Sequence, residues 1–193
     1  MPRVRTESKQ SEILAAASRV FAARQYHEVL CDEIAQEAGV GKGTIYRYFR
    51  TKEDLYFATI LQGYEAINHS LASAITAETS PEKRLERIAR ELFEYFWDRR
   101  SFYSLLYRNE QRFLAQEGRL KKNREHLVKI VEQTIREGVE SGQFRQVDTK
   151  TAAEMFLGMI RAINVFRRES DRLDDLVAEL IGLWARGIEK ERS

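Results

Sequence analysis

The segment from Asp32 to Lys52, DEIAQEAGVGKGTIYRYFRTK, combines residues that suit contact with a nucleic acid. Lys42 and Lys52 supply ammonium groups, and Arg47 supplies a guanidinium. Cationic side chains bind phosphate, and arginine also pairs with the O6 and N7 edge of guanine in the DNA major groove. The segment therefore indicates DNA binding.

Two short helices joined by a glycine turn are expected to position these side chains. Ile34 and Ala38 lie on one face of the first helix, and residues 39–41 (GVG) interrupt it, because glycine tolerates the positive φ of a sharp turn. Ile45 and Phe49, four residues apart, form the inward face of the second helix. A short helix with an apolar back and a cationic front fits a major groove.

The run AGVGKGTIYRYFRTKEDL resembles the helix-turn-helix signature of TetR-type transcriptional regulators. The resemblance implies a DNA-binding head followed by a helical body that holds an effector pocket and pairs with a second subunit. Gln25 departs from the pattern, which often has glycine there, and Val29-Leu30 replaces a Thr/Ser pair. Leu30 cannot supply a hydroxyl N-cap, and we expect Asp32, as an acid in the first turn, to compensate in part.

Seven residues of this segment are predicted DNA contacts, and each has an alternative role. The lysines either bind phosphate or are solvated, and Thr44 contacts a base edge or phosphate or is only a surface residue of the helix. Gly43 lets the backbone approach a base or only permits close packing, and the tyrosines reach phosphate or pack. Arg47 reads a base or binds a phosphate. The predicted contacts are Lys42, Gly43, Thr44, Tyr46, Arg47, Tyr48 and Lys52.

Composition favours an all-α fold in a chain of 193 residues with two prolines and no alternating strand pattern. Residues 1–52 carry nine Lys/Arg against six Asp/Glu, whereas the remainder carries 23 against 24, so the positive excess accompanies the motif. The single cysteine, Cys31, excludes an internal disulfide. No apolar run reaches the roughly 20 residues of a membrane span, and a cytoplasmic protein is expected.

We predict a helix-turn-helix domain over residues 1–52 and a helical effector-binding and dimerisation domain over residues 53–193. Residues 1–7 are expected to form a loose basic arm. Thr51 with Asp54, Ser80 before Pro81, and Asp148 are predicted helix starts. About nine helices are expected: 8–25, two within 32–49, 52–77, 81–98, a short one from 101, 115–140, 149–167 and 173–190.

Aromatic residues are concentrated in the predicted body. Most must belong to a helical core, yet the TetR resemblance implies that the helices carrying them surround an effector pocket. Such a pocket suits a hydrophobic or aromatic small molecule of unknown identity. The candidate lining residues are Tyr64, Phe93, Trp97, Tyr103 and Tyr107.

The last two predicted helices carry broad apolar faces. These faces serve either an intramolecular core or, as the resemblance implies, a four-helix bundle with a second subunit. The predicted dimer contacts are Phe156, Met159, Ile163, Val177, Ile181 and Trp184.

Together these patterns favour a dimeric repressor that binds an inverted-repeat operator and is released by a small ligand. A ligand-independent architectural DNA-binding protein is the first alternative, and a helical enzyme is the second. The three histidines show no metal-ligand spacing, and no phosphate loop or nucleophile motif is present. We therefore expect no catalytic residue, metal or cofactor.

Overall fold

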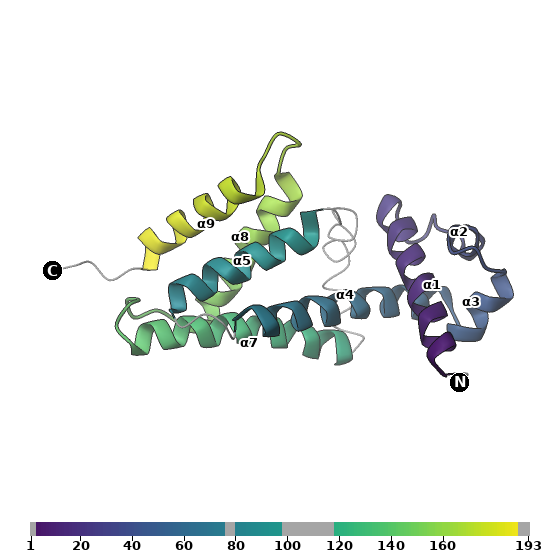
Figure 1. Ribbon diagram of the computed structural model, residues 1–193, viewed down its shortest axis with the longest axis horizontal. Coiled ribbons are helices and arrows are strands. Elements are labelled where there is room, and N and C mark those ends of the chain that lie inside the picture. The colour runs from purple at the N-terminus through teal and green to yellow at the C-terminus, as the bar shows by residue number, and fades with distance from the viewer. Residues whose placement is uncertain (1–2, 76–79, 98–117, 189–193) are drawn as a thin grey trace. The chain divides into compact units, whose positions relative to one another are not determined.

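The computed structural model describes residues 3–75, 80–97 and 118–188, and within these ranges every regular element is an α-helix (Figure 1). This confirms the predicted all-α fold. The short helix predicted to start at Ser101 lies outside the described residues. The helices are α1 (Arg3–Ala23), α2 (Cys31–Glu37), α3 (Lys42–Tyr48), α4 (Lys52–Ile75), α5 (Pro81–Trp97), α7 (Gly118–Glu140), α8 (Thr149–Phe166) and α9 (Leu173–Ile188).

Helix α1 begins earlier than the sequence patterns predicted. It starts at Arg3, so the expectation of a loose arm over residues 1–7 was wrong. No glycine or proline occurs between Arg3 and Ala23, and Pro2 stands directly before the helix, where proline is tolerated. Because nothing in this segment interrupts the helical propensity, α1 extends as far as Arg3.

Local sequence signals set several other helix ends as predicted. At the start of α4, the Thr51 N–H donates to Asp54 Oδ2 and the Asp54 N–H donates to Thr51 Oγ1, both at 3.0 Å, which completes a capping box. At the start of α8, Asp148 Oδ1 accepts from the Thr151 N–H at 2.6 Å. Gly142 adopts a φ of 73° directly after α7, where residues with a side chain are disfavoured.

The chain forms two compact units, and their boundary falls inside α4. The first unit runs to Glu65 and the second begins at Ala66, whereas the sequence prediction placed the boundary at residue 52. The first unit also includes the start of α7, residues 118–121. Helix α4 therefore contributes its N-terminal part to one core and its C-terminal part to the other.

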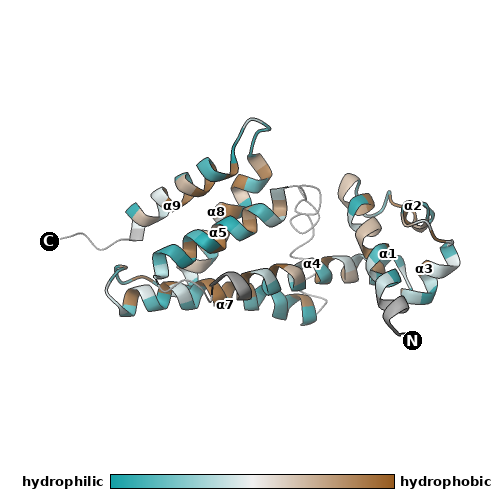
Figure 2. Ribbon diagram, in the orientation of Figure 1, coloured by the Kyte–Doolittle hydropathy of each residue, from teal (hydrophilic) through white to brown (hydrophobic). Residues whose placement is uncertain are grey.

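Each unit buries its own apolar side chains. In the first unit, α1 contributes Ile13 and Phe21, while α2 and α3 contribute Ile34 and Ile45, all at most 1% exposed. In the second unit, α5 packs against both α8 and α9. Figure 2 shows hydrophobic and hydrophilic stripes along these helices, as expected for elements that bury one face.

Candidate nucleic-acid interface and the outer face of α8 and α9

Helix α3 is held by its apolar back, and its polar side chains project outward. Ile45 is 1% exposed and Phe49, which ends the helix, is 5% exposed. The predicted contacts Lys42, Gly43, Tyr46 and Arg47 are exposed, and Thr44 and Tyr48 are half-buried. The Arg47 guanidinium lies 5.3 Å from the centre of the Tyr48 ring. Six of the seven predicted residues therefore lie on one short helix.

Gly43 is not required by packing within the chain. A Cβ atom built at this position would have no heavy atom within 4 Å, apart from its own helix and neighbours. This removes the close-packing alternative for Gly43. The open space instead suits the close approach of an external molecule to the backbone of α3.

Lys42 is engaged within the chain by Asp32 of α2. The Lys42 ammonium donates to Asp32 Oδ2 at 2.8 Å, and both side chains are more than half exposed. This hydrogen bond raises the pKa of Lys42. Lys42, for which the sequence predicted a phosphate contact, therefore already has an acidic partner within the chain.

The N-terminus of α2 is capped by a residue other than the predicted one. Asp32 pairs with Lys42, whereas Glu33 Oε2 accepts from the Leu30 N–H at 2.9 Å. Arg24 binds the same carboxylate at 2.5 Å, and this bond is the main reason that the pKa of Glu33 is lowered. Glu33 therefore supplies the acceptor half of a capping box that the leucine side chain cannot complete.

Tyr46 is linked to α2 through Cys31. The tyrosine is 44% exposed, while Cys31 is a buried free thiol. Their side-chain hydrogen bond is the largest cause of the raised pKa of Tyr46. Tyr46 is therefore exposed on α3 while its pKa reflects the neighbouring thiol of α2.

Lys52, the seventh predicted contact, points back into the first unit. Its ammonium donates to the carbonyl oxygens of Tyr26 at 2.8 Å and Val29 at 2.9 Å. It also lies 4.4 Å from the centre of the Tyr26 ring. The structure thus separates Lys52 from the six residues of α3.

The residues of the predicted effector pocket are only partly described. Tyr64 is buried in the first unit, and Phe93 is buried in the second. Trp97 is half-buried, with the Arg167 guanidinium 4.1 Å from the centre of its ring. Tyr103 and Tyr107 lie outside the described residues, so the pocket stays a prediction.

Helix α8 carries two apolar stripes instead of one. The inner stripe includes Ala153, Phe156 and Ile160, each at most 2% exposed. The outer stripe follows a spacing of four residues through Met155, Met159 and Ile163 and ends at Phe166, which is 81% exposed. The six predicted dimer contacts did not include Met155 or Phe166, although both belong to the apolar face that the sequence spacing indicated.

Helix α9 repeats this division between an inner and an outer face. Val177 and Trp184 are buried, and the Trp184 ring lies 5.1 Å from the Phe156 ring in an edge-on contact. Ile181 is half-buried, and Leu183, which the prediction omitted, is 54% exposed. Three of the six predicted dimer contacts, Phe156, Val177 and Trp184, therefore belong to the core of their own subunit.

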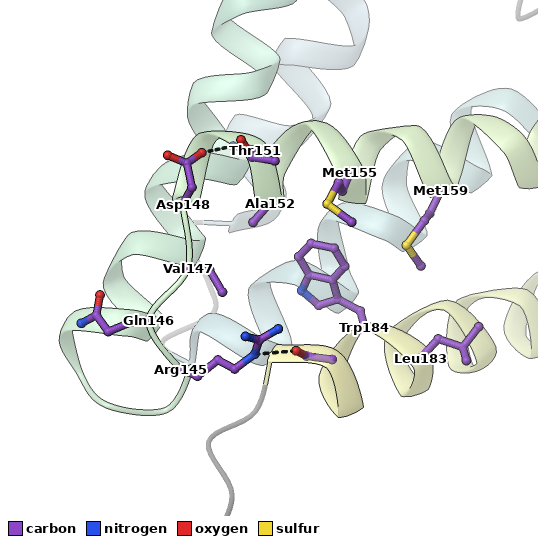
Figure 3. Close-up of a pocket in the computed structure, with 11 residues that line it drawn as sticks. Arg145, Gln146, Val147, Asp148, Thr151, Ala152, Met155, Met159, Leu183 and Trp184 are labelled. Atoms are coloured by element: carbon purple, nitrogen blue, oxygen red, sulfur yellow. Dashed lines mark hydrogen bonds between the residues drawn. The ribbon is translucent and has the colours of Figure 1, made fainter.

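A hollow of about 420 Å³ opens between the turn before α8, the start of α8 and the end of α9 (Figure 3). Met155, Met159 and Leu183 of the outer apolar face contribute to its wall, as does the buried Trp184. Within the described residues, the Trp184 indole nitrogen has no hydrogen-bond partner. Its lining residues include none of the aromatic residues predicted to bind an effector.

Two further observations concern metal binding and membrane insertion. No group of three or more His, Cys, Asp or Glu side chains in the described ranges has an arrangement that could hold a metal ion. None of the helices in the searched part of the chain has the length and apolar character needed to span a membrane.

Two family descriptions match this chain in succession. Residues 13–59 match the bacterial regulatory proteins of the tetR family, a range that contains α2, α3 and the start of α4. Residues 78–165 match the tetracyclin repressor-like C-terminal domain. The two matches follow the order of the DNA-binding segment and the helical body.

Curated relatives are transcriptional regulators. The chain is 27% identical over 173 residues to the fatty acid metabolism regulator protein of Bacillus subtilis, covering 88% of this chain and 89% of that protein. It is 30% identical over 108 residues to the HTH-type transcriptional activator FasR of Mycolicibacterium smegmatis. That match covers 56% of this chain and about half, 49%, of FasR.

A solved structure has the same fold. The transcriptional regulator FadR from Bacillus subtilis, solved in complex with stearoyl-CoA, aligns with a TM-score of 0.78. The alignment covers 93% of this chain and 99% of that chain, at 21% sequence identity. The likeness extends through both units and establishes the fold.

Proposed function

Because the chain belongs to the tetR family of bacterial regulatory proteins and its relatives are transcriptional regulators, we propose that it is a dimeric repressor that responds to a ligand. Each subunit places α3 in the major groove of one half of an inverted-repeat operator. The observation that carries this proposal is the outer face of α3, where cationic and hydroxyl groups surround an open glycine. Such a face can combine phosphate contacts with readout of base edges.

The second subunit binds through the outer stripes of α8 and α9. Phe166, Met155 and Leu183 are among the few large apolar side chains left exposed in the described ranges. Water contact with such a face is unfavourable, and a two-fold bundle would bury it twice. The two recognition helices then lie about one DNA turn apart, roughly 34–36 Å, on one face of the duplex.

The effector is an apolar small molecule, and acyl-CoA thioesters are the first class to test. Two observations support this choice: a relative is named for fatty acid metabolism, and a structure with the same fold was solved with stearoyl-CoA. An effector that binds the DNA-free state 100-fold more tightly supplies about 2.7 kcal/mol toward release. DNA must then weaken effector binding by the same factor.

Selection of bound duplexes from a random library tests the whole proposal. We expect an inverted repeat, and we expect stearoyl-CoA, but not coenzyme A alone, to weaken binding to it. A single asymmetric site would contradict the proposal that a symmetric dimer binds the operator. A consensus that no acyl thioester or other apolar metabolite affects would instead favour the ligand-independent DNA-binding alternative.

A further inference from the structure

Lys52 and Tyr56, one turn apart on α4, hold Tyr26 between them. The Lys52 ammonium lies 4.4 Å from the Tyr26 ring centre, and the Tyr56 ring lies 4.9 Å from it at an angle of 65°. Phe21 of α1 makes an edge-on contact with Tyr56 at 4.8 Å. We call Phe21, Tyr26, Lys52 and Tyr56 the Tyr26 clamp.

The Tyr26 clamp acts on the turn that leads into α2. This turn is closed by the Glu28 N–H, which donates to the Gln25 carbonyl at 3.0 Å. The Lys52 ammonium also restrains this turn, because it donates hydrogen bonds to the Tyr26 and Val29 carbonyl oxygens. Val29 itself is fully buried, and α2 begins two residues later at Cys31.

We propose that Lys52 is a positioning residue, which fixes the α1–α2 turn against α4 and so sets the placement of α2 and α3 for reading DNA. This inference rests on the proposed operator binding. It gives Lys52 a different role from the phosphate contact expected from the sequence. Hydrogen bonds from a charged donor are stronger than neutral ones, so the two carbonyl contacts hold the turn firmly.

The two roles predict different salt dependence. Removing a phosphate contact weakens binding to all duplexes and lowers the salt slope by about 0.9. Removing a positioning contact misplaces α3, which disturbs base readout and leaves the number of phosphate contacts the same. Operator affinity then falls while affinity for a scrambled duplex and the salt slope stay close to those of the unmodified protein.

The test uses the full-length Lys52→Met variant, which keeps the length of the side chain and removes its charge. Binding to the selected operator and to a scrambled duplex is measured at a series of salt concentrations. We expect a loss of roughly tenfold for the operator only. Lys42→Met, on the exposed face of α3, is the matched control and should lower the slope for both duplexes.

Amide hydrogen exchange supplies a readout that does not depend on DNA. Lys52→Met should accelerate exchange in the segment that joins α1 to α2, and Tyr26→Leu should do the same to a smaller degree. Tyr26→Phe keeps the ring and should accelerate exchange less than Tyr26→Leu does. Tyr26→Leu also serves if Lys52→Met does not fold, because it loosens the clamp and leaves the ammonium in place.

Each possible result decides between the roles. A slope reduced by about 0.9 with equal losses on both duplexes would assign Lys52 to a phosphate and overturn the proposal. Lower thermal stability with unchanged operator affinity of the folded variant would leave a purely structural role and overturn it as well. If the unmodified protein selects no operator, the proposed function fails, and unchanged exchange in Lys52→Met would separately refute the clamp.

Discussion

Helices α3 and α8 present opposite kinds of outer surface. The outward side chains of α3 include an exposed lysine, arginine and tyrosine, whereas those of α8 include exposed Met155 and Phe166. Both helices bury an apolar inner face, through Ile45 in α3 and Phe156 in α8. The outer face therefore distinguishes a helix suited to a charged polyanion from one suited to another apolar surface.

The difference between inner and outer stripes of α8 should be large in stability measurements. Phe156→Ala removes a fully buried ring and should lower the free energy of unfolding by about 3–5 kcal/mol. Phe166→Ala removes a ring that is 81% exposed and should change the stability of the separate subunit by less than about 0.5 kcal/mol. Urea denaturation at low protein concentration measures both.

For subunit association, the order of the two effects should be reversed, with Phe166→Ala causing the more specific loss. Phe166→Ala should weaken subunit association in sedimentation experiments while the subunits stay folded, because it removes outer apolar area. Leu183→Ala provides a second outer-face change on α9. Equal losses of stability for Phe156→Ala and Phe166→Ala would mean that the two stripes are not distinct.

The outer face of α3 should show its character in sequence specificity. Arg47→Ala should relax the preference at one base pair, with a loss of about 1–3 kcal/mol there if the guanidinium is bidentate to guanine. Selection of bound DNA by the variant measures this change. An unchanged consensus with weaker overall binding would reassign Arg47 to a phosphate.

The fold could be predicted closely where the sequence holds local signals. The capping box of Thr51 and Asp54, the cap at Asp148 and the turn at Gly142 all depend on residues within a few positions of one another. The start of α1 at Arg3 was missed because the charged residues before Ser8 carry no signal that marks a helix boundary. The division of α4 between two compact units depends on contacts distant in sequence, which local patterns do not report.

Side-chain exposure was predictable on α3 and less so elsewhere. A polar residue opposite an apolar stripe must face outward, so periodicity alone predicts that Lys42 and Arg47 are exposed. An apolar residue on α8 or α9 belongs to either of two apolar surfaces, and periodicity cannot assign Trp184 to one of them. The carbonyl partners of Lys52 lie 23 and 26 residues away, beyond any local pattern.

The pair of Lys42 and Asp32 provides a smaller test of the α3 face. Lys42→Ala should lower the salt slope of DNA binding by about 0.9, because a phosphate contact is lost. Asp32→Asn removes the acid that holds the ammonium at 2.8 Å and should strengthen binding to all duplexes by roughly two- to fivefold. Titrations of operator and scrambled DNA measure both changes. If Asp32→Asn weakens binding, Asp32 orients Lys42 instead of competing with phosphate.

The smallest expected effects come from the acids that cap α2 and α8. The pKa of Glu33 is lowered chiefly by its bond to Arg24, and the pKa of Asp148 is lowered chiefly by Thr151. A lowered pKa in the folded state means that each carboxylate stabilises the fold above its ordinary titration range. This contribution is lost as the pH falls through the lowered pKa.

Glu33→Gln and Asp148→Asn should therefore reduce stability at neutral pH and make little difference in acid, where the carboxylates of the unmodified protein are protonated. Thermal unfolding across this pH range measures the total effect, and amide exchange assigns it to a region. Glu33→Gln should loosen the start of α2 only, because its bonds to Arg24 and Leu30 lie within the first unit. Asp148→Asn should loosen the start of α8 only, where the carboxylate accepts from Thr151. A loss that persists unchanged in acid would show that the caps act through shape instead of charge.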